Sequence, residues 1–313
     1  MHIVFVGAGG VGGYFGARLV AAGALVSFVA RGRHAQAIAD QGLRVTSPLG
    51  DVLVRPHAVA ADPAALETAD IVVFAVKLPD AQAAAVMIRP LVGPGTVVLP
   101  LQNGVDVADL LAAELGPEAV ALGTAHIAVK IGAPGVIEHG GAFARLRFGA
   151  MHAGQAPALQ KFLAACTVAG IDAEMVDDMR RASWEKFVLL VGVSSLTALT
   201  RLPVEATRKS PELRALLLSV MAETAVLARA EGINLPDDFV GRQMSFVNDM
   251  PATMKASMLH DLEAGRPLEL PWLAGAVVRR SQRHGLATPA CGFITAALSP
   301  YVHGAPAPVG APD

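Results

Sequence analysis

The sequence has little charge, few cysteines and no surplus of basic residues. Only 17% of its 313 residues are charged and 53% are hydrophobic, a composition that excludes a disordered chain. The formal net charge is −2, so nothing in the composition points to a nucleic acid or an anionic membrane as a partner. A chain of this length can form two domains, each with a sizeable core.

Patterns typical of disulfides, metal sites and membrane segments are also missing. The two cysteines, Cys166 and Cys291, form no spaced framework, which favours a reducing, cytoplasmic setting. The nine histidines show no metal-binding spacing, so we expect no metal site. No basic segment precedes a cleavable apolar one, and the apolar run from Phe187 is shorter than the about 20 residues that span a bilayer. We therefore expect neither a leader nor a membrane partner.

Over its first half the sequence alternates buried strands with helices. Apolar runs predict strands at residues 2–7, 25–30, 70–77 and 95–104, and helices at residues 11–22 and 80–89. This alternation predicts βαβ units in a doubly wound parallel sheet. Residues 123–149, with Gly and Pro-Gly turns, predict antiparallel strands. A helix at 156–169 and a strand at 171–176 would close this α/β domain.

The second half is expected to be helical almost throughout. The predicted helices cover residues 179–199, 211–231, 237–247, 252–264, 271–284 and 289–301. We therefore divide the chain into an N-terminal Rossmann-type domain, residues 1–176, and a C-terminal all-α domain, residues 177–303. Residues 304–313, rich in Pro, Gly and Ala, are predicted to form a loose tail.

A glycine-rich loop joins the first predicted strand to the first predicted helix. Its residues are Gly7, Ala8, Gly9, Gly10, Val11 and Gly12, which fit the pattern G-x-G-x-x-G. The first glycine of that pattern makes the turn, the second lets the backbone approach a pyrophosphate, and the third lets the helix pack on the strand. The pattern also occurs in plain glycine turns, but its place at a strand–helix junction favours dinucleotide binding.

The residue after the second predicted strand indicates which dinucleotide binds. An NAD site normally places Asp or Glu about 20 residues beyond the glycines, to bind the ribose 2′-hydroxyl. This sequence has Arg31 there, followed by Gly32 and Arg33. A guanidinium suits a 2′-phosphate, so NADP(H) is favoured over a pair of ordinary surface arginines.

Two further loops follow predicted strands, at the edge where α/β sheets bind ligands. Lys77 ends one strand, and Gln102-Asn103-Gly104 ends the next. Lys77 could equally be a solvated lysine, and Asn103-Gly104 an ordinary turn.

Lys186 immediately precedes the longest apolar stretch of the sequence, in a predicted helix. Such a lysine usually snorkels, packing its stem while its ammonium stays in water. Ser183, Ser194 and Thr197 lie roughly on its helix face, however, and that face could line a cleft. Desolvation there would lower the lysine pKa towards that of a useful general acid.

Glu269 and Ser257 are weaker candidates. Glu269 precedes Pro271, a good first residue for a helix, and could be a carboxylate favoured by the helix dipole. Ser257 could be a surface hydroxyl.

Taken together, these motifs resemble the ketopantoate reductase (2-dehydropantoate 2-reductase) family over nearly the whole chain. The matching pieces, in the family's order, are GAGGVG, the arginine after strand two, VK at 76–77, QNG at 102–104, WEKF at 184–187, SML at 257–259 and LELPWLAG at 268–275. The family reduces the ketone of ketopantoate with NADPH, for pantothenate and coenzyme A synthesis.

The resemblance implies a role for each candidate. Lys186 would be the general acid, and Glu269 would hold the substrate, orient the lysine and lie near the cofactor. Ser257 would bind the substrate carboxylate, and Asn103 would lie beside the nicotinamide and the substrate. The glycine loop would hold the pyrophosphate, with Arg31 and Lys77 at the adenosine 2′-phosphate. The family also suggests a homodimer formed through the helical domain.

Two positions depart from the family pattern. Its helix typically carries substrate-binding asparagines four and eight residues after the lysine, where this chain has Leu190 and Ser194. We keep Ser194 among the expected substrate contacts, whereas Leu190 removes one polar contact. Another 2-keto acid is therefore an alternative substrate. A β-hydroxyacid dehydrogenase and a non-catalytic NADP(H) sensor are rival functions.

Overall fold

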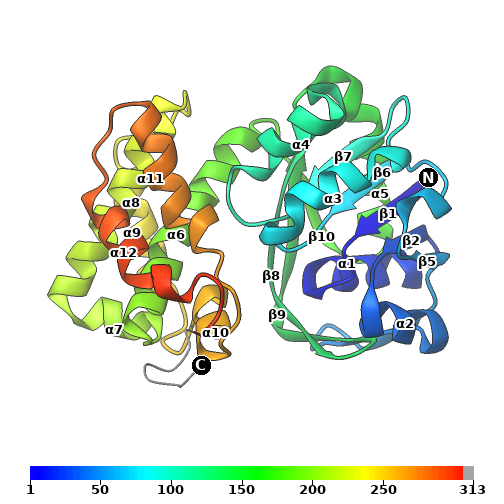
Figure 1. Ribbon diagram of the computed structural model, residues 1–313, viewed down its shortest axis with the longest axis horizontal. Coiled ribbons are helices and arrows are strands. Elements are labelled where there is room, and N and C mark those ends of the chain that lie inside the picture. The colour runs from blue at the N-terminus through cyan, green and yellow to red at the C-terminus, as the bar shows by residue number, and fades with distance from the viewer. Residues whose placement is uncertain (306–313) are drawn as a thin grey trace, which may run out of the picture. The chain divides into compact units, whose positions relative to one another are not determined.

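The protein is described here by a computed structural model that covers residues 1–305 (Figure 1). The chain divides into two compact units. Unit 1 contains residues 1–102 and 106–179, and unit 2 contains residues 103–105 together with the chain from residue 180 onward. The sequence prediction placed the boundary at residue 176. Most of the predicted loose tail, from residue 306 on, lies outside the described residues.

The central sheet of unit 1 is parallel and buried on both faces. Its strands, in spatial order, are β5 (Ala58–Ala60), β2 (Leu25–Val29), β1 (His2–Val6), β6 (Ile71–Phe74) and β7 (Val97–Pro100). Helices α1 (Gly10–Ala21), α2 (Gly32–Gln41), α3 (Ala81–Met87) and α4 (Val107–Leu115) alternate with these strands along the chain. The α/β class and the doubly wound N-terminal domain are therefore confirmed.

A second sheet lies on the other side of α1. It contains β3 (Leu43–Thr46), β4 (Val52–Val54), β8 (Leu122–Ala133), β9 (Val136–Gly149) and β10 (Asp172–Met175), and α5 (Ala156–Val168) packs on β10. The predicted antiparallel segment is one long hairpin, β8–β9, and its turn is the Pro134-Gly135 pair. A Cβ at Gly13 would lie 2.8 Å from Ile137, and one at Gly16 would lie 2.4 Å from Phe28. These two glycines let α1 fit between the sheets.

Unit 2 is all helical, as predicted for the C-terminal domain. Its elements are α6 (Met179–Thr200), α7 (Val204–Lys209), α8 (Pro211–Ala230), α9 (Phe239–Asp249), α10 (Ser257–Glu263), the 3₁₀ turn η6 (Leu270–Trp272), α11 (Ala274–Arg283) and α12 (Pro289–Leu298). One hydrophobic core joins them, and it includes Trp184, Val188 and Val191 of α6.

Among residues 1–305, α6 alone is long and apolar enough to cross a membrane by length and composition. It has 22 residues, more than the apolar run from Phe187 suggested, because it also includes the polar residues from Met179 on. Its most apolar stretch of 18 residues has a mean hydropathy of 1.2, and 67% of that stretch is buried inside the structure. A core helix passes the same test, and burial of this kind is what a core helix shows.

Some predicted elements differ in detail. Pro271 was expected to begin a helix, but it lies inside η6, and α11 begins only at Ala274. The predicted helix at 252–264 is shorter, since α10 begins at Ser257. Sequence patterns did not predict α2, α4, α7, β3, β4 and β5. These elements are short, and a short segment offers few turns or alternations from which a pattern can be recognised.

Candidate active site

The glycine loop has the backbone that its sequence pattern requires. Gly7 lies in the left-handed region, with φ +99°, and a Cβ there would lie 2.8 Å from the carbonyl oxygen of Ala75. Gly12 is tighter still, because a Cβ there would lie 2.1 Å from the carbonyl oxygen of Gly7. These two glycines therefore make the turn and the close helix–strand contact, as the dinucleotide fingerprint demands.

Gly9 differs from its neighbours because it faces open space. A Cβ built on Gly9 would have no atom within 4 Å, so the loop backbone is accessible at this point. Gly9 is also the N-cap of α1, and no side chain caps the helix there. The first amides of α1 can therefore donate to an anion. An accessible backbone with uncapped amides fits the pyrophosphate of a dinucleotide.

The two basic candidates of unit 1 follow strands on either side of β1. Arg31 follows β2 and is the N-cap of α2, whereas Lys77 follows β6 and precedes a short 3₁₀ turn. Both side chains are exposed. The chain thus places two cations at the carboxyl edge of the sheet that carries the glycine loop, where open α/β sheets bind ligands.

Unit 2 brings three of the predicted residues into one polar cluster. Lys186 Nζ donates to Oδ1 of Asn103 at 3.2 Å, and Asn103 Nδ2 donates to Oε2 of Glu269 at 3.4 Å. Asn103 therefore bridges an ammonium and a carboxylate, each through the matching end of its amide. The lysine and the glutamate come from segments that lie far apart in the sequence.

Local packing explains how these side chains meet. Trp184 and Phe187 contact each other edge to face at 5.5 Å in the core and anchor the start of α6 around Lys186. Gly104 has φ +95°, and a Cβ there would lie 3.0 Å from the carbonyl oxygen of Trp272. A residue with a side chain would push Asn103 away from the 3₁₀ turn that Glu269 precedes.

The burial of Lys186 alters its acidity. Loss of hydration lowers the lysine pKa to about 8, while the nearby Glu269 carboxylate acts in the opposite direction and raises it. By surface area the Lys186 residue is partly buried rather than fully buried. A lysine of this kind can exchange a proton near neutral pH.

Two other predicted residues of unit 2 lie in different surroundings. Ser257 is the first residue of α10, and its side chain is exposed. Ser194 is completely buried, and within residues 1–305 its Oγ has no hydrogen-bond partner. Leu190 is partly buried and packs against the helical core.

Gln102 belongs to the QNG motif, but the sequence predicted no role for it. Its Nε2 donates to the carbonyl oxygen of Val76 at 3.1 Å, which ties the loop after β7 to the loop after β6. Its Oε1 is buried and has no partner among the described residues. The sequence signals for Gln102 were its place at the end of a strand and its membership of the QNG motif.

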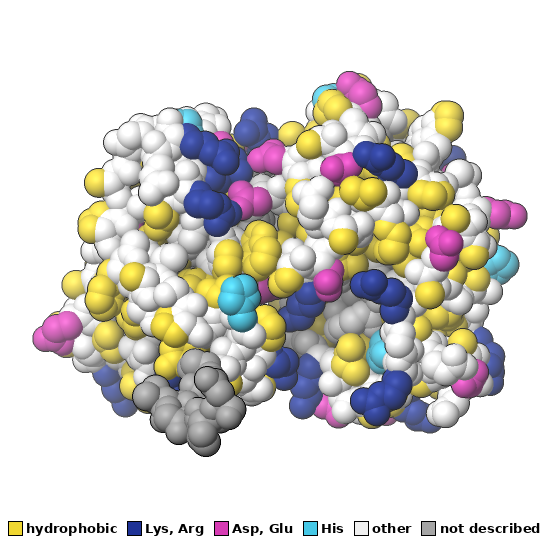
Figure 2. All heavy atoms as spheres, in the orientation of Figure 1, with side chains coloured by type: hydrophobic (Ala, Val, Ile, Leu, Met, Phe, Trp, Pro, Cys, Tyr) yellow, Lys and Arg dark blue, Asp and Glu magenta, His cyan; other side chains and the backbone are white. Residues whose placement is uncertain are grey.

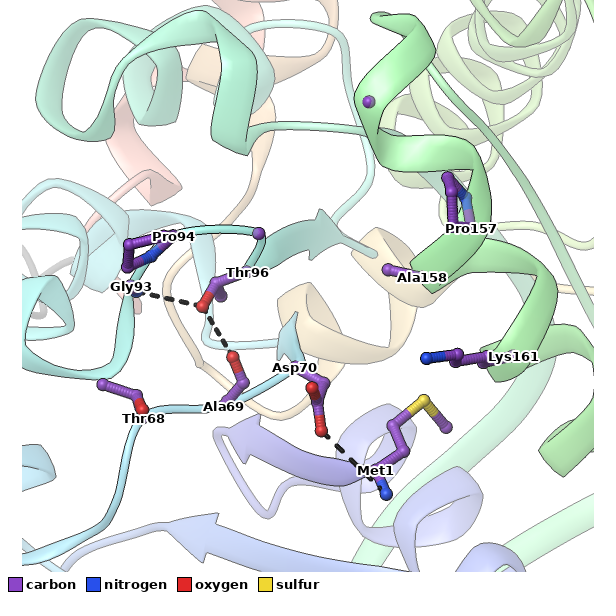
Figure 3. Close-up of a pocket in the computed structure, with 12 residues that line it drawn as sticks. Met1, Thr68, Ala69, Asp70, Gly93, Pro94, Thr96, Pro157, Ala158 and Lys161 are labelled. Carbon is purple, nitrogen blue, oxygen red and sulfur yellow. Dashed lines mark hydrogen bonds and ion pairs between the residues drawn. The ribbon is translucent and has the colours of Figure 1, made fainter.

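The cavity drawn in Figure 3 is a separate feature of unit 1. It has a volume of about 390 Å³ and is lined by Met1, Asp70 and Thr96 among others, with Lys161 of α5 on the facing wall. Met1, Asp70 and Thr96 precede β1, β6 and β7, so the cavity lies at the amino edge of the sheet. The glycine loop lies at the opposite edge, where ligands of such sheets bind.

The surface agrees with the low net charge. On the face shown in Figure 2, Lys and Arg side chains are interspersed with Asp, Glu and hydrophobic side chains.

Two family models match the chain. Residues 3–153 match "Ketopantoate reductase PanE/ApbA", and residues 178–302 match its C-terminal model. A 2-dehydropantoate 2-reductase from Halobacterium salinarum is 31% identical over 92% of this chain and 95% of its own length.

Solved structures show the same likeness. A PanE/ApbA family ketopantoate reductase from Ralstonia eutropha superposes with a TM-score of 0.86, at 34% identity, over 96% of this chain and 98% of that one. A D-mandelate dehydrogenase, solved with NADH and anilino(oxo)acetate, has a TM-score of 0.87 over 96% and 98% of the two chains. At 22% identity, that second likeness concerns the fold alone.

Proposed function

Because the chain belongs to the ketopantoate reductase family and is an NAD(P)-dependent oxidoreductase acting on a CH–OH group, we propose that it reduces a 2-keto acid with NADPH. Ketopantoate is the first candidate substrate, and (R)-pantoate would be its product. The observation that carries the proposal is the Lys186–Asn103–Glu269 cluster with its lowered lysine pKa.

The N-terminal residues would hold the cofactor. The amides of the Gly7–Gly12 loop would receive the pyrophosphate, and Arg31 and Lys77 would bind the adenosine 2′-phosphate. Charge-assisted hydrogen bonds of this type are about twice as strong as neutral ones, so two cations give a preference for the phosphorylated cofactor. Asn103 and Glu269 would lie near the nicotinamide end.

Reduction of a ketone needs a hydride at carbon and a proton at oxygen. NADPH, when bound, supplies the hydride. Lys186 would hold the proton at Nζ and transfer it to the ketone oxygen as negative charge develops there, leaving a neutral amine that regains a proton from solvent. Before the transfer, its positive charge would stabilise the developing alkoxide.

Asn103 and Glu269 would orient that lysine. The Asn103 Oδ1 accepts one of the three ammonium protons and so leaves others to point at the substrate. The Glu269 carboxylate raises the lysine pKa and thus keeps more of the ammonium protonated near neutral pH. Ser257 would bind the substrate carboxylate, and Ser194 would contribute a hydroxyl on the same helix as Lys186.

A 2-keto acid with an apolar side chain is the second candidate substrate, and Leu190 favours it. An aliphatic side chain four residues after the lysine offers no hydrogen bond to a polar substituent such as the hydroxyl of ketopantoate. A β-hydroxyacid dehydrogenase and a cofactor sensor remain rivals, but a sensor has no need for an acid of this kind. We further propose that the enzyme acts in the cytoplasm, as a homodimer.

A panel of 2-keto acids tests the proposal. Purified protein is mixed with NADPH and ketopantoate, or with 2-keto acids bearing apolar side chains, and the absorbance of NADPH is followed. We expect NADPH oxidation with at least one of them. Cofactor binding without turnover on the whole panel would instead favour the sensor.

The matched variants are Lys186→Ala and Lys209→Ala. Lys209 lies on the surface of α7, where its ammonium pairs with Glu205, so its loss should leave the rate unchanged. Loss of a general acid lowers the rate by about 10²–10⁴-fold. Full activity of Lys186→Ala would refute the assigned mechanism.

A further inference from the structure

His34 is held between the glycine loop and the long hairpin of unit 1. It lies in the first turn of α2, its Nε2 is 2.8 Å from the carbonyl oxygen of Ala8, and its Nδ1 accepts a hydrogen bond from the amide of Gly135 at 3.0 Å. Its side chain is partly buried. One imidazole thus connects the loop that follows β1 to the turn between β8 and β9.

These two contacts determine which ring nitrogen carries the proton. An N–H group can donate only to a nitrogen with a free lone pair, so the Gly135 amide requires Nδ1 to be unprotonated. The proton of the neutral ring is then on Nε2. His34 therefore donates from Nε2 to the Ala8 carbonyl.

The Gly135 side of the contact is rigid. Gly135 has φ +76°, and its carbonyl oxygen accepts from the Arg44 amide of β3 at 2.9 Å. A Cβ there would lie 3.1 Å from Ala37 of α2, so the turn fits closely on that helix. The hairpin turn is fixed by both β3 and α2, and its amide sets the orientation of the imidazole ring.

The contact with Ala8 involves the peptide group that joins Ala8 to Gly9 in the glycine loop. The helical ladder of α1 starts at the Gly9 carbonyl, which accepts from Gly13 at 2.7 Å, so the Ala8 carbonyl lies just before it and needs another donor. In a trans peptide the Ala8 C=O and the Gly9 N–H point in opposite directions. When His34 binds the carbonyl, the Gly9 amide is directed away from the imidazole, and a Cβ on the same Gly9 would meet no atom within 4 Å.

We propose that His34 is a positioning residue of the dinucleotide site: by binding the Ala8 carbonyl it holds the Gly9 amide towards the pyrophosphate. The inference rests on the proposed function, because it assumes that the glycine loop binds the dinucleotide. Without His34 the Ala8–Gly9 peptide can rotate, and a carbonyl oxygen that faced the phosphates would repel them. The predicted effect is on cofactor affinity and not on the chemical step.

Two conservative variants separate the two hydrogen bonds of the ring. His34→Gln keeps a donor at the reach of Nε2 and loses the acceptor for Gly135. His34→Asn keeps an acceptor at the place of Nδ1 and loses the donor for Ala8. His34→Ala loses both. His57→Gln is the control, because His57 is an exposed histidine of the same unit whose ring contacts that of His2.

The dissociation constant of NADPH is measured by isothermal titration calorimetry, together with Tm and with kcat at saturating NADPH. We expect His34→Asn and His34→Ala to raise the dissociation constant about tenfold, as the loss of one hydrogen bond does, and His34→Gln to stay within about threefold of wild type. Each single variant leaves one backbone group without its partner, so both should lower Tm, and the NADPH affinity alone separates them. The kcat of each variant should remain unchanged.

Other results would overturn the proposal. An NADPH affinity that is normal in His34→Asn and weakened in His34→Gln would assign His34 to hairpin packing alone. Equal affinity in all variants would show that the Ala8 contact does not matter. If the wild-type protein binds neither NADPH nor NADH, the proposed function itself is refuted. The titration of the wild-type protein distinguishes this result from the other two.

Discussion

Lys186 and Asn103 are 83 residues apart in the sequence, yet the lysine Nζ donates to the asparagine Oδ1 at 3.2 Å. Asn103 is neutral, so it fixes the direction of the ammonium without adding a charge that would raise the lysine pKa. The charge comes from Glu269, which is 3.4 Å from the other end of the same amide. Asn103 thus sets the orientation of the lysine, whereas the lysine pKa is lowered mainly by loss of hydration and raised in part by Glu269.

The first prediction concerns the pH dependence of ketone reduction. Lys186 must be protonated to act as the acid, and its pKa is lowered to about 8, mainly by loss of hydration. The value of kcat/KM should therefore be constant at pH values below this pKa and decrease as the pH rises through it. Well above the pKa, kcat/KM should fall about tenfold for each pH unit. Initial rates between neutral and strongly alkaline pH would measure this decrease, the alkaline limb of the pH profile.

Glu269→Gln should move the same limb in a known direction. The carboxylate raises the lysine pKa, so its replacement by a neutral amide should shift the limb to lower pH. A shift to higher pH would contradict the assignment of the limb to Lys186. Glu263→Gln is the control, because Glu263 pairs with Lys255 in the same unit and is not part of the cluster.

The second prediction concerns the choice between NADPH and NADH. Arg31→Ala should raise the KM for NADPH by roughly 10–100-fold, the range expected for a lost hydrogen bond to a charged group. The KM for NADH should hardly change, because NADH has no 2′-phosphate. Arg33→Ala is the control, since Arg33 is also exposed at the start of α2. If the KM of Arg31→Ala rises equally for NADPH and NADH, Arg31 does not bind the 2′-phosphate.

Some of this site was predictable from the sequence, and some was not. The need for Gly12 was, because a Cβ there would meet the carbonyl oxygen of Gly7 in the same loop, whereas the contact of Gly7 is with Ala75, just after β6 and far along the chain. The extra glycines Gly13 and Gly16 were not explained, because Gly13 meets Ile137 of the second sheet and Gly16 meets Phe28 of the central sheet, and both partners lie outside the loop and α1. A glycine in the sequence indicates that another group packs where a Cβ would lie, but it does not identify that group.

The polar cluster shows a different limit. The resemblance to the ketopantoate reductases named Lys186, Asn103 and Glu269, whereas their spacing alone could not, since Asn103 and Glu269 are 166 residues apart. Pro271 was interpreted as a helix start, but the chain forms a 3₁₀ turn there before α11 begins. His34 carried no signal, because both of its partners are backbone groups, which any sequence supplies.

The third prediction compares two alanine substitutions within the glycine loop. Gly12→Ala should lower stability by about 1–3 kcal/mol or more, because its Cβ would lie 2.1 Å from the Gly7 carbonyl oxygen. Gly9→Ala should leave Tm almost unchanged, because its Cβ would meet no atom within 4 Å, but it should weaken NADPH binding by occupying the space of the pyrophosphate. Thermal unfolding and an NADPH titration of both variants measure the two effects. Normal NADPH affinity of Gly9→Ala would show that the pyrophosphate lies elsewhere.

The last prediction concerns the substrate. Leu190 lies four residues after Lys186 and packs against the helical core, where the family typically has a substrate-binding asparagine. If this position faces the substrate, Leu190→Asn should raise kcat/KM for ketopantoate by about tenfold or more, since one hydrogen bond to a polar substrate is worth about 1–3 kcal/mol. It should lower kcat/KM for 2-keto acids with apolar side chains, because a polar amide replaces an apolar contact.

Leu189→Asn is the matched control, because Leu189 is the neighbouring leucine of α6 and also packs against the core. It projects about 100° around the helix from Leu190 and should disturb packing without changing the ratio between the two substrates. The ratio of the two kcat/KM values is the readout, since general damage to the helix lowers both values together. An unchanged ratio in Leu190→Asn would remove Leu190 from the substrate site and leave ketopantoate as the favoured substrate.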